Sequence, residues 1–170
     1  LDRSSAASDV YKRQVGISCI QNNWGRVEIN DGTITSDADC TIKNRGGLRM
    51  NGGTVATSNA EGTVIDCNGD FGDTQINGGT IKGGKDGIRL ADLGSSEVTL
   101  KNAAFENNTQ SNIHLGEGQT INIKKSFAGT AKIRVDDPAR GRQITTDNED
   151  LSYQNKLKLF SMNSGYIIGY

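Results

Sequence analysis

The segment VEINDGTI (residues 27–34) recurs as LRMNGGTV (residues 48–55) and as TQINGGTI (residues 74–81). A fourth segment, VTLKNAAF (residues 98–105), is a degenerate copy. The copies begin 21, 26 and 24 residues apart. A sequence that repeats at a period in this range is typical of a solenoid, in which every repeat is one structural unit.

A second series, out of phase with the first, consists of six isoleucines that are 20 to 25 residues apart. They are Ile20, Ile42, Ile65, Ile88, Ile113 and Ile133. The last three lie in the contexts GIRL, NIHL and KIRV, where apolar and polar residues alternate as in a half-buried strand. A third series keeps the same rhythm: Ile34, Val55, Ile81, Phe105 and Phe127. We therefore expect three strands in each repeat.

A short strand cannot bury its apolar face alone, but stacking it on its copy in the next repeat buries both. Gly-Gly and Asn-Gly steps between the strands supply the positive φ angles of sharp corners. We predict an all-β fold, a single-stranded right-handed parallel β-helix of about six coils over residues 15–146. Leucine-rich repeats are disfavoured because LxxLxL spacing is absent. An antiparallel sandwich is the main alternative, although it gives no reason for residues to repeat in register.

The first residues depart from the repeat. The stretch SAASDVYKRQ (residues 5–14) resembles translated adapter sequence at the ends of metagenomic reading frames. The alternative is a genuine disordered terminus, and both interpretations leave residues 1–14 outside the packed fold. If the stretch is an artefact, we expect the chain to be a fragment whose true N-terminal part is missing.

The last residues also change pattern. In NEDLSYQNKLKLF (residues 148–160) three apolar side chains recur at helical spacing, namely Tyr153, Leu157 and Phe160. We expect residues 147–170 to form a short helix followed by a strand in GYIIGY (residues 165–170). Because tandem stacks need atypical end units, this segment is a candidate cap, and the start of a following domain is the alternative.

Charge and hydropathy exclude several function classes. Lys and Arg number 19 against 20 Asp and Glu, so the formal net charge of -1 gives no basis for binding nucleic acid or an anionic membrane. No apolar run approaches the length of about 18 residues that a membrane span needs. Any export signal is expected outside this fragment.

Two sets of small residues recur with the repeat. Cys19, Cys40 and Cys67 form no CxxC pair, so we expect buried, inert thiols that could line up as one inward column. An oxidised pair stays open for an exported protein. The asparagines Asn22, Asn44 and Asn68 are expected to stack as an internal ladder.

Two segments carry a resemblance to a known family. INGGTIKGG (residues 76–84) and SNIHLGEGQTINIKKSFAGTAKIRVDD (residues 111–137) resemble the right-handed parallel β-helix, or pectin-lyase-like, surface proteins of gut Firmicutes. The resemblance implies an exported protein, extracellular or in the cell wall, with an adhesin-like or carbohydrate-related role. It leads us to expect a non-catalytic scaffold that binds a polysaccharide or a host-surface glycan. The alternative is a fragment of a polysaccharide lyase or glycoside hydrolase of the same fold.

Candidate metal ligands are few. Similarity to pectate lyases would place a calcium ion among clustered carboxylates, for which the candidates are Asp66, Asp70 and Asp73 in and around CNGDFGD. Asp is also favoured in such Gly-rich turns for turn chemistry alone. Asp136 and Asp137, near two arginines, are expected in a solvated loop. No other cofactor and no catalytic residue is predicted.

The candidate glycan-binding residues are charged side chains on outward strand positions. They are Lys82, Arg89, His114, Lys132 and Arg134. His114 alternates with Ile113 and Leu115, so we expect it on the surface at the position that Arg89 and Arg134 hold in neighbouring repeats. Such residues can follow an extended polymer, and a merely soluble face is the alternative. The single tryptophan, Trp24, lies in the first coil and is not counted as a sugar-binding residue.

Overall fold

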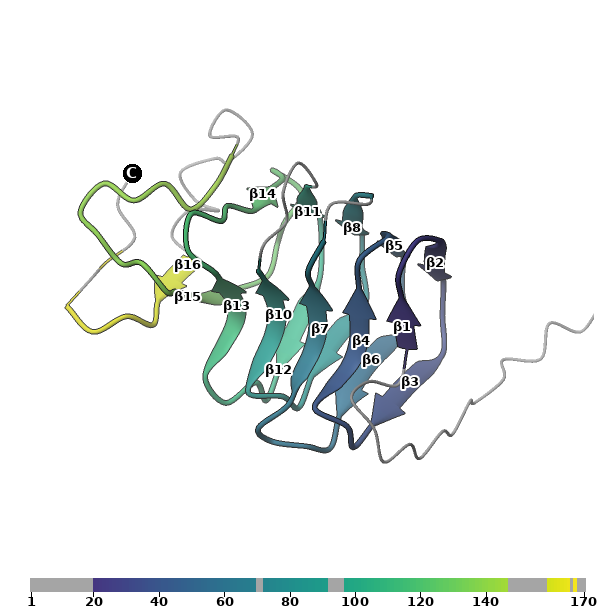
Figure 1. The fold of residues 1–170 in the computed structure, drawn as a ribbon. Helices are drawn as coiled ribbons and strands as arrows, with labels where there is room; N and C mark the ends of the chain where they lie inside the picture. The colour runs from purple at the N-terminus through teal and green to yellow at the C-terminus, as the bar shows by residue number, and fades with distance from the viewer. Residues whose placement is uncertain (1–19, 70–71, 92–96, 147–158, 166, 168–170) are drawn as a thin grey trace, which may run out of the picture.

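The computed structural model describes residues 20–69, 72–91, 97–146, 159–165 and 167. The chain winds into a parallel β-solenoid of about five turns (Figure 1). Each complete turn contributes one strand to each of three sheets, and every strand pairs in parallel with its copy in the next turn. The prediction of a parallel solenoid with three strands per repeat is confirmed.

The strands fall into three sheets whose order follows the turns. The seven-stranded sheet contains β1 (Ile20–Asn22), β4 (Cys40–Asn44), β7 (Thr63–Cys67), β10 (Asp86–Leu90), β13 (Ser111–Leu115), β15 (Ala131–Val135) and β16 (Leu159–Ser161). The five-stranded sheet contains β2 (Arg26–Ile29), β5 (Gly47–Met50), β8 (Thr74–Ile76), β11 (Val98–Leu100) and β14 (Asn122–Ile123). The four-stranded sheet contains β3 (Thr33–Ser36), β6 (Thr54–Thr57), β9 (Thr80–Lys82) and β12 (Ala104–Glu106).

The isoleucine series forms one continuous column in the seven-stranded sheet. Each isoleucine is in register with the next along the whole series, from Ile20 to Ile133. The four central members have no exposed surface. The predicted stacking of these strands is therefore confirmed residue by residue.

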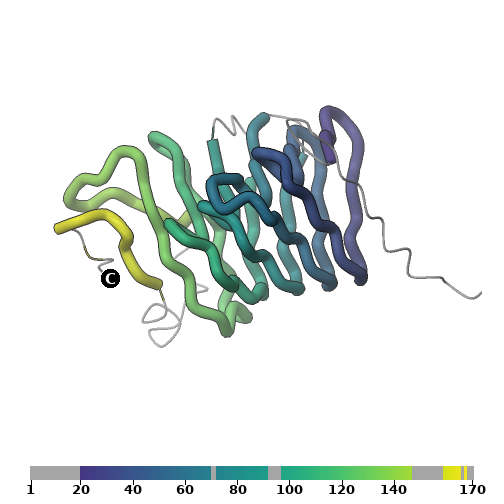
Figure 2. Tube along the Cα trace, turned by 90° about the horizontal axis from the view of Figure 1, so that it is seen from below, coloured from purple at the N-terminus to yellow at the C-terminus, as the bar shows by residue number. Residues whose placement is uncertain are grey.

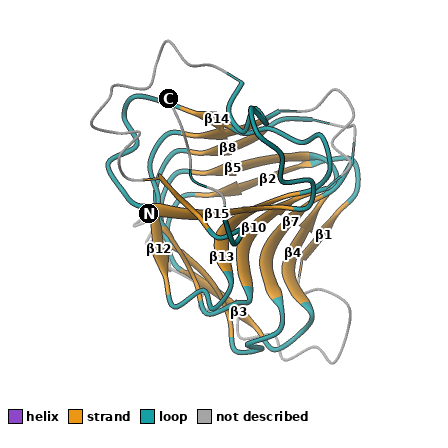
Figure 3. Ribbon diagram, turned by 90° about the vertical axis from the view of Figure 1, so that its left-hand side faces the viewer, coloured by secondary structure: helices purple, strands orange, loops and turns teal. Residues whose placement is uncertain are grey.

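The other two sheets supply matching apolar columns. In the five-stranded sheet, Ile29, Met50, Ile76 and Leu100 lie in register, and in the four-stranded sheet the column runs from Ile34 to Phe105. Viewed along the stack, the sheets lie on three sides of this interior (Figure 3). The turns follow one another side by side in chain order (Figure 2). The thin core agrees with an aromatic content of only 5%.

The expected six coils were one too many, because about five turns are formed. The sixth isoleucine, Ile133, lies in β15, but within the described residues the five-stranded sheet ends at β14 and the four-stranded sheet at β12. A single parallel bridge between Ile121 and Thr145 is what continues the five-stranded side. Counting isoleucines overestimated the coils because a strand in one sheet does not require a complete turn.

The C-terminal prediction was partly wrong. The described residues contain no helix, and therefore no helix that is long and apolar enough to cross a membrane. Residues 147–158, which hold most of the expected helix, lie outside the described residues. Phe160, assigned to that helix, instead lies in β16, because burial of Leu159 beside Ala131 imposes strand alternation. The expected strand at residues 165–170 is not seen at Gly165 or Ile167, and the other four residues are not described.

The asparagine ladder has two members rather than three. Asn22 donates through Nδ2 to Oδ1 of Asn44 at 2.7 Å, and the two residues are in register. In the next turn, the residue in register with Asn44 is Cys67 and not Asn68. The repeat is one residue shorter here than the distance between Asn44 and Asn68.

The cysteines do not share a column. Cys40 is in register with Thr63, whereas Cys67 is in register with Asn44. Both thiols are free and buried, and burial is the largest reason that the pKa of each rises to about 12. Their predicted inertness is physically reasonable, since the thiolate is the reactive form. Cys19 lies outside the described residues.

Glycines form one corner of the solenoid between the five-stranded and four-stranded sheets. Gly32, Gly53 and Gly79, in the three repeated segments, all have positive φ angles, of 86°, 75° and 97°. A Cβ on Gly79 would lie 2.5 Å from Met50 Cε and 2.7 Å from the Gly53 carbonyl oxygen, whereas a Cβ on Gly32 would meet nothing within 4 Å. Gly79 must therefore be glycine for two reasons: its φ angle is positive, and the preceding turn leaves no room for a Cβ.

These two glycines make a matched pair for testing the stack. Gly32→Ala should lower the free energy of unfolding by about 1 kcal/mol, the cost of a left-handed φ. Gly79→Ala carries the same cost and also the overlap with the preceding turn, so it should lose about 2 kcal/mol more. Urea unfolding followed by circular dichroism measures both. Equal losses would contradict the close stacking of corners.

Candidate functional site

A row of polar side chains crosses the outer face of the seven-stranded sheet. We define the outer ladder as the residues that occupy one register position in six successive strands: Gln21, Lys43, Asp66, Arg89, His114 and Arg134. The ladder lies one residue C-terminal to the isoleucine column, so it faces away from the core. The predicted alignment of His114 with Arg89 and Arg134 is confirmed.

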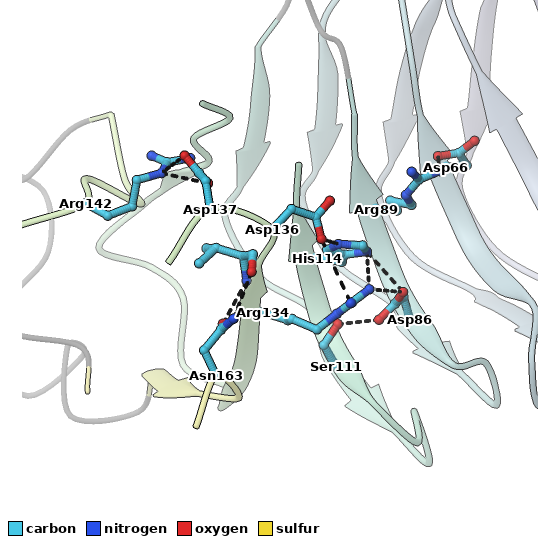
Figure 4. A network of polar contacts seen from close by, with 11 residues as sticks. Asp66, Asp86, Arg89, Ser111, His114, Arg134, Asp136, Asp137, Arg142 and Asn163 are labelled. Carbon is cyan, nitrogen blue, oxygen red and sulfur yellow. Dashed lines mark hydrogen bonds and ion pairs between the residues drawn. The ribbon is translucent and has the colours of Figure 1, made fainter. Parts of the chain in front are cut away.

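His114 does not lie on the surface as expected. It is 5% exposed, and both ring nitrogens have partners (Figure 4). Nε2 lies 2.7 Å from Oδ1 of Asp136, while Nδ1 lies 3.2 Å from Oδ2 of Asp86 and 2.7 Å from Nη2 of Arg134. The prediction failed because alternation gives the direction of a side chain but not what covers it.

Asp86 anchors this cluster from the start of β10. Its carboxylate is 4% exposed and accepts a hydrogen bond from the Ser111 hydroxyl at 2.5 Å, while Arg134 Nη2 donates to it at 3.3 Å. Burial alone would raise the pKa of Asp86. The hydrogen bonds that it makes with His114 and Ser111, together with the positive charges of His114 and Arg134, outweigh this effect. The pKa of Asp86 is therefore lowered from its usual value. Sequence inspection missed Asp86 and Ser111, although both stand two residues before a column isoleucine and are therefore in register.

The geometry allows two proton arrangements at the imidazole. A proton on Nδ1 would be donated to Asp86, whereas a bare Nδ1 would accept from the Arg134 guanidinium, which can only donate. In the second arrangement Nε2 carries the proton and donates it to Asp136. Ser111 bonds to Asp86 and not to His114, so the residues do not form a serine–histidine–aspartate relay.

Asp66, one turn before Asp86 on the same sheet, has the opposite electrostatic environment. Its Oδ1 is buried without a hydrogen-bond partner, and Arg89 Nη1 lies 3.8 Å away. Burial raises the pKa of Asp66 above its usual value, although Arg89, Lys43, Arg45 and His114 each pull the pKa down. The outer ladder thus contains one carboxylate that is poorly compensated for its loss of water.

The two neighbouring aspartates after β15 have separate partners. Asp136 contacts His114, whereas both carboxylate oxygens of Asp137 accept hydrogen bonds from Arg142 Nε, at 3.1 and 3.0 Å. Gly118 N also donates to Asp137 at 3.2 Å, and Arg142 is 14% exposed in its side chain. The segment expected to be a merely solvated loop is therefore held by an ion pair in which one Arg142 N–H is shared between both oxygens of Asp137.

The calcium candidates are not gathered by the described residues. Asp66 lies on the outer ladder beside Arg89, while Asp73 precedes β8 and accepts a hydrogen bond from Glu97 N at 3.2 Å. Asp70 lies outside the described residues. Where the structure describes the chain, no group of three or more His, Cys, Asp or Glu side chains could hold a metal ion. The calcium site stays a prediction.

The two candidate lysines occupy different faces. Lys132 lies in β15, two residues before Arg134, so it shares the outer face of the seven-stranded sheet, where it is exposed. Lys82 lies in β9 of the four-stranded sheet, in register with Ala56 and Glu106. The five predicted ligand-binding residues are therefore divided between two sheets, with four of them on one.

No protein-family model, curated protein or solved structure matched the chain.

Asp86 and Asp66 allow a matched test of the electrostatics, because the same Asp→Asn change should act in opposite directions. A lowered folded pKa stabilises the fold above the unfolded pKa, so Asp86→Asn should cost about 3 kcal/mol at pH 7. A raised folded pKa destabilises the fold at neutral pH, so Asp66→Asn should stabilise it, on the order of 1 kcal/mol.

The pH dependence separates the two residues further. The loss in Asp86→Asn should shrink as pH falls through the lowered folded pKa, and the gain in Asp66→Asn should vanish as pH falls below the unfolded value of 3.8. Urea unfolding between pH 3 and 7, with a chelator present, measures both. If both variants are less stable at pH 7, the assignment for Asp66 is wrong.

Proposed function

We propose that this chain is part of a non-catalytic extracellular scaffold, adhesin-like in character, that binds a polysaccharide along the outer face of its seven-stranded sheet. The observation that carries the proposal is the register of the outer ladder. Successive turns repeat one side-chain position at strand spacing, about 4.8 Å. A linear polymer lying along the solenoid axis would meet the ladder side chains that are at least partly exposed, namely Gln21, Lys43, Arg89 and Arg134.

The charges of this face favour an acidic glycan. Three members of the outer ladder are lysine or arginine and one is aspartate, and Lys132 adds a further cation on the same face. Arg89 keeps 41% of its side chain exposed although its guanidinium lies beside Asp66. Such cations steer and hold polymers that carry carboxylates, with an affinity that salt weakens.

The state of His114 supports a scaffold over an enzyme. Catalysis by a general base needs a side chain within reach of substrate, but both nitrogens of His114 are engaged and the ring is covered. Asp86 is equally inaccessible. The cluster instead ties β10, β13 and β15 together across the sheet, as a structural brace would.

The finer fold assignment and the location belong to the same proposal. Parallel strands joined by crossovers are right-handed in about 98% of known cases, which supports right-handed coiling. An extended stack of short strands with polar outer rows suits an exported, wall-associated or extracellular protein. The likeness of residues 76–84 and 111–137 to pectin-lyase-like surface proteins supports this placement.

A polysaccharide lyase or glycoside hydrolase is the second candidate, and one observation favours it. Asp136 has 45% of its side chain exposed and lies 2.7 Å from His114 Nε2, so a proton-transferring carboxylate would be accessible and backed by an imidazole. Incubation with acidic and neutral polysaccharides, followed by an assay for new chain ends, distinguishes the candidates. Depolymerisation that Asp136→Asn abolishes would establish the enzyme.

The scaffold proposal is tested by two lysines on different sheets. Lys43→Gln, on the outer ladder, should weaken binding of polygalacturonate about threefold at low salt, because one partly exposed charge contributes up to about 1 kcal/mol. Lys82→Gln removes the same charge from the four-stranded sheet and should leave affinity unchanged. Affinity electrophoresis and calorimetry measure the binding.

Two outcomes would overturn the scaffold proposal. One is that the wild-type chain binds neither polygalacturonate nor a neutral glucan at low salt. The other is that Lys82→Gln weakens binding as much as Lys43→Gln, since affinity would then follow net charge and not the outer ladder.

A further inference from the structure

A pocket of about 440 Å³ lies away from the outer ladder, where the first three turns enter the five-stranded sheet. Its lining includes Trp24, Arg26 and Gly47 from the first two turns and Arg49, Asp73 and Gln75 from the second and third. We name it the Trp24 pocket. Its volume falls within the range of about 300–1,000 Å³ that is usual for small-molecule sites.

The strand register directs the polar lining residues outward. Glu28, Arg49 and Gln75 share one row, and Arg26 is in register with Gly47 in the row beside it. The residues between these rows, such as Leu48, point into the core. The pocket is therefore a face of the sheet built from three stacked turns, with charged side chains on its walls.

Two arginines in the pocket lack anionic partners. Among the described residues, neither Arg26 nor Arg49 donates a side-chain hydrogen bond or joins an ion pair. Glu28 is in register with Arg49, but its Oε1 accepts from Asn51 Nδ2 at 3.0 Å and it makes no ion pair with the arginine. By contrast, Arg89, Arg134 and Arg142 each pair with an aspartate. Among the residues that the structure describes, the two guanidinium groups of the pocket therefore have no ion-pair partner.

Glycines leave the floor of the pocket without side chains. A Cβ on Gly47 would meet the Arg26 side chain at 3.6–3.7 Å, which is ordinary contact. Gly72 has a φ of 115°, and a Cβ there would lie 2.8 Å from Gly47 N, so this lining position requires glycine. A ligand can thus approach the backbone between the arginines.

Trp24 adds an apolar wall. It is 75% exposed, which is unusual for so large an apolar side chain. The planar indole can pack against the apolar face of a ring. The two guanidinium groups beside it can bind a carboxylate on that ring, because guanidinium geometry matches a carboxylate bidentately. Asp73 Oδ1 accepts from Glu97 N, which fixes this carboxylate and leaves Oδ2 to accept from a hydroxyl.

We propose that the Trp24 pocket is a second binding site, separate from the outer ladder, for a sugar unit that carries a carboxylate. The sugar ring lies against Trp24, and its carboxylate pairs with Arg26 and Arg49. Ring hydroxyl groups donate to Asp73 and Gln75. Charge complementarity selects the acidic sugar over its neutral counterpart.

The sole tryptophan of the chain gives this pocket its own signal. Titration of the full chain with trigalacturonate should change Trp24 fluorescence saturably at concentrations up to about 10 mM. Its methyl ester, which has the same rings without the charge, should bind at least about tenfold more weakly, a difference of about 1.4 kcal/mol. Raised salt should weaken the charged ligand alone.

Three variants locate the response. Arg49→Gln should weaken trigalacturonate binding about tenfold. Gly47→Ala places a methyl group on the floor at a distance that the fold tolerates, so it should weaken binding while the thermal unfolding curve stays near that of the parent. Lys43→Gln, on the outer ladder, should leave the Trp24 titration unchanged.

Several outcomes would overturn the Trp24 pocket as an acidic-sugar site. They are the absence of a fluorescence change up to about 10 mM, equal affinity for the methyl ester, and undiminished binding in Arg49→Gln. Weaker polymer binding in Lys43→Gln with an unchanged Trp24 titration would support two separate sites. If Trp24 fluorescence does not change while the polymer still binds, the pocket is not an acidic-sugar site and binding at the outer ladder remains supported.

Discussion

Backbone hydrogen bonds between successive turns hold this solenoid together, and the isoleucine column fixes their register. Each strand is too short to bury its apolar face alone, so it gains a core only by lying on its copy. A slip of one residue would turn Arg89 into the interior and Ile88 into solvent. The apolar column therefore sets the position of every outward side chain as well.

That constraint explains how polar residues from distant parts of the chain meet. Asp86 and Arg134 are 48 residues apart in sequence, yet their side chains are in contact because β10, β13 and β15 lie side by side. Asp86 occupies the row that holds Thr63 in the preceding turn and Ser111 in the next. One turn earlier, Asp66 is buried with far less compensation. The same scaffold thus produces opposite electrostatic environments at nearly equivalent places.

The architecture and the outer ladder could be predicted from sequence, because both follow from residues that repeat at one period. The surroundings of His114 could not be predicted. Asp136 lies beyond the end of β15, and no periodic pattern in the sequence indicates that its carboxylate contacts the imidazole. Phe160 was misassigned because three apolar residues at helical spacing outweighed the single inward position of Leu159. Trp24 was set aside for lying in the first coil, and only the register of three turns places it beside Arg26 and Arg49.

Disulfide trapping between outward positions tests the in-register stacking of turns most directly. Gln75 and Thr99 are in register on adjacent strands, where Cα atoms lie about 4.8 Å apart, within disulfide range. Asn122 lies one turn further along the same row. In-register stacking predicts that Gln75→Cys with Thr99→Cys cross-links readily within one chain, and that Gln75→Cys with Asn122→Cys does not. Cross-linking of the second pair, or none of the first, would contradict it.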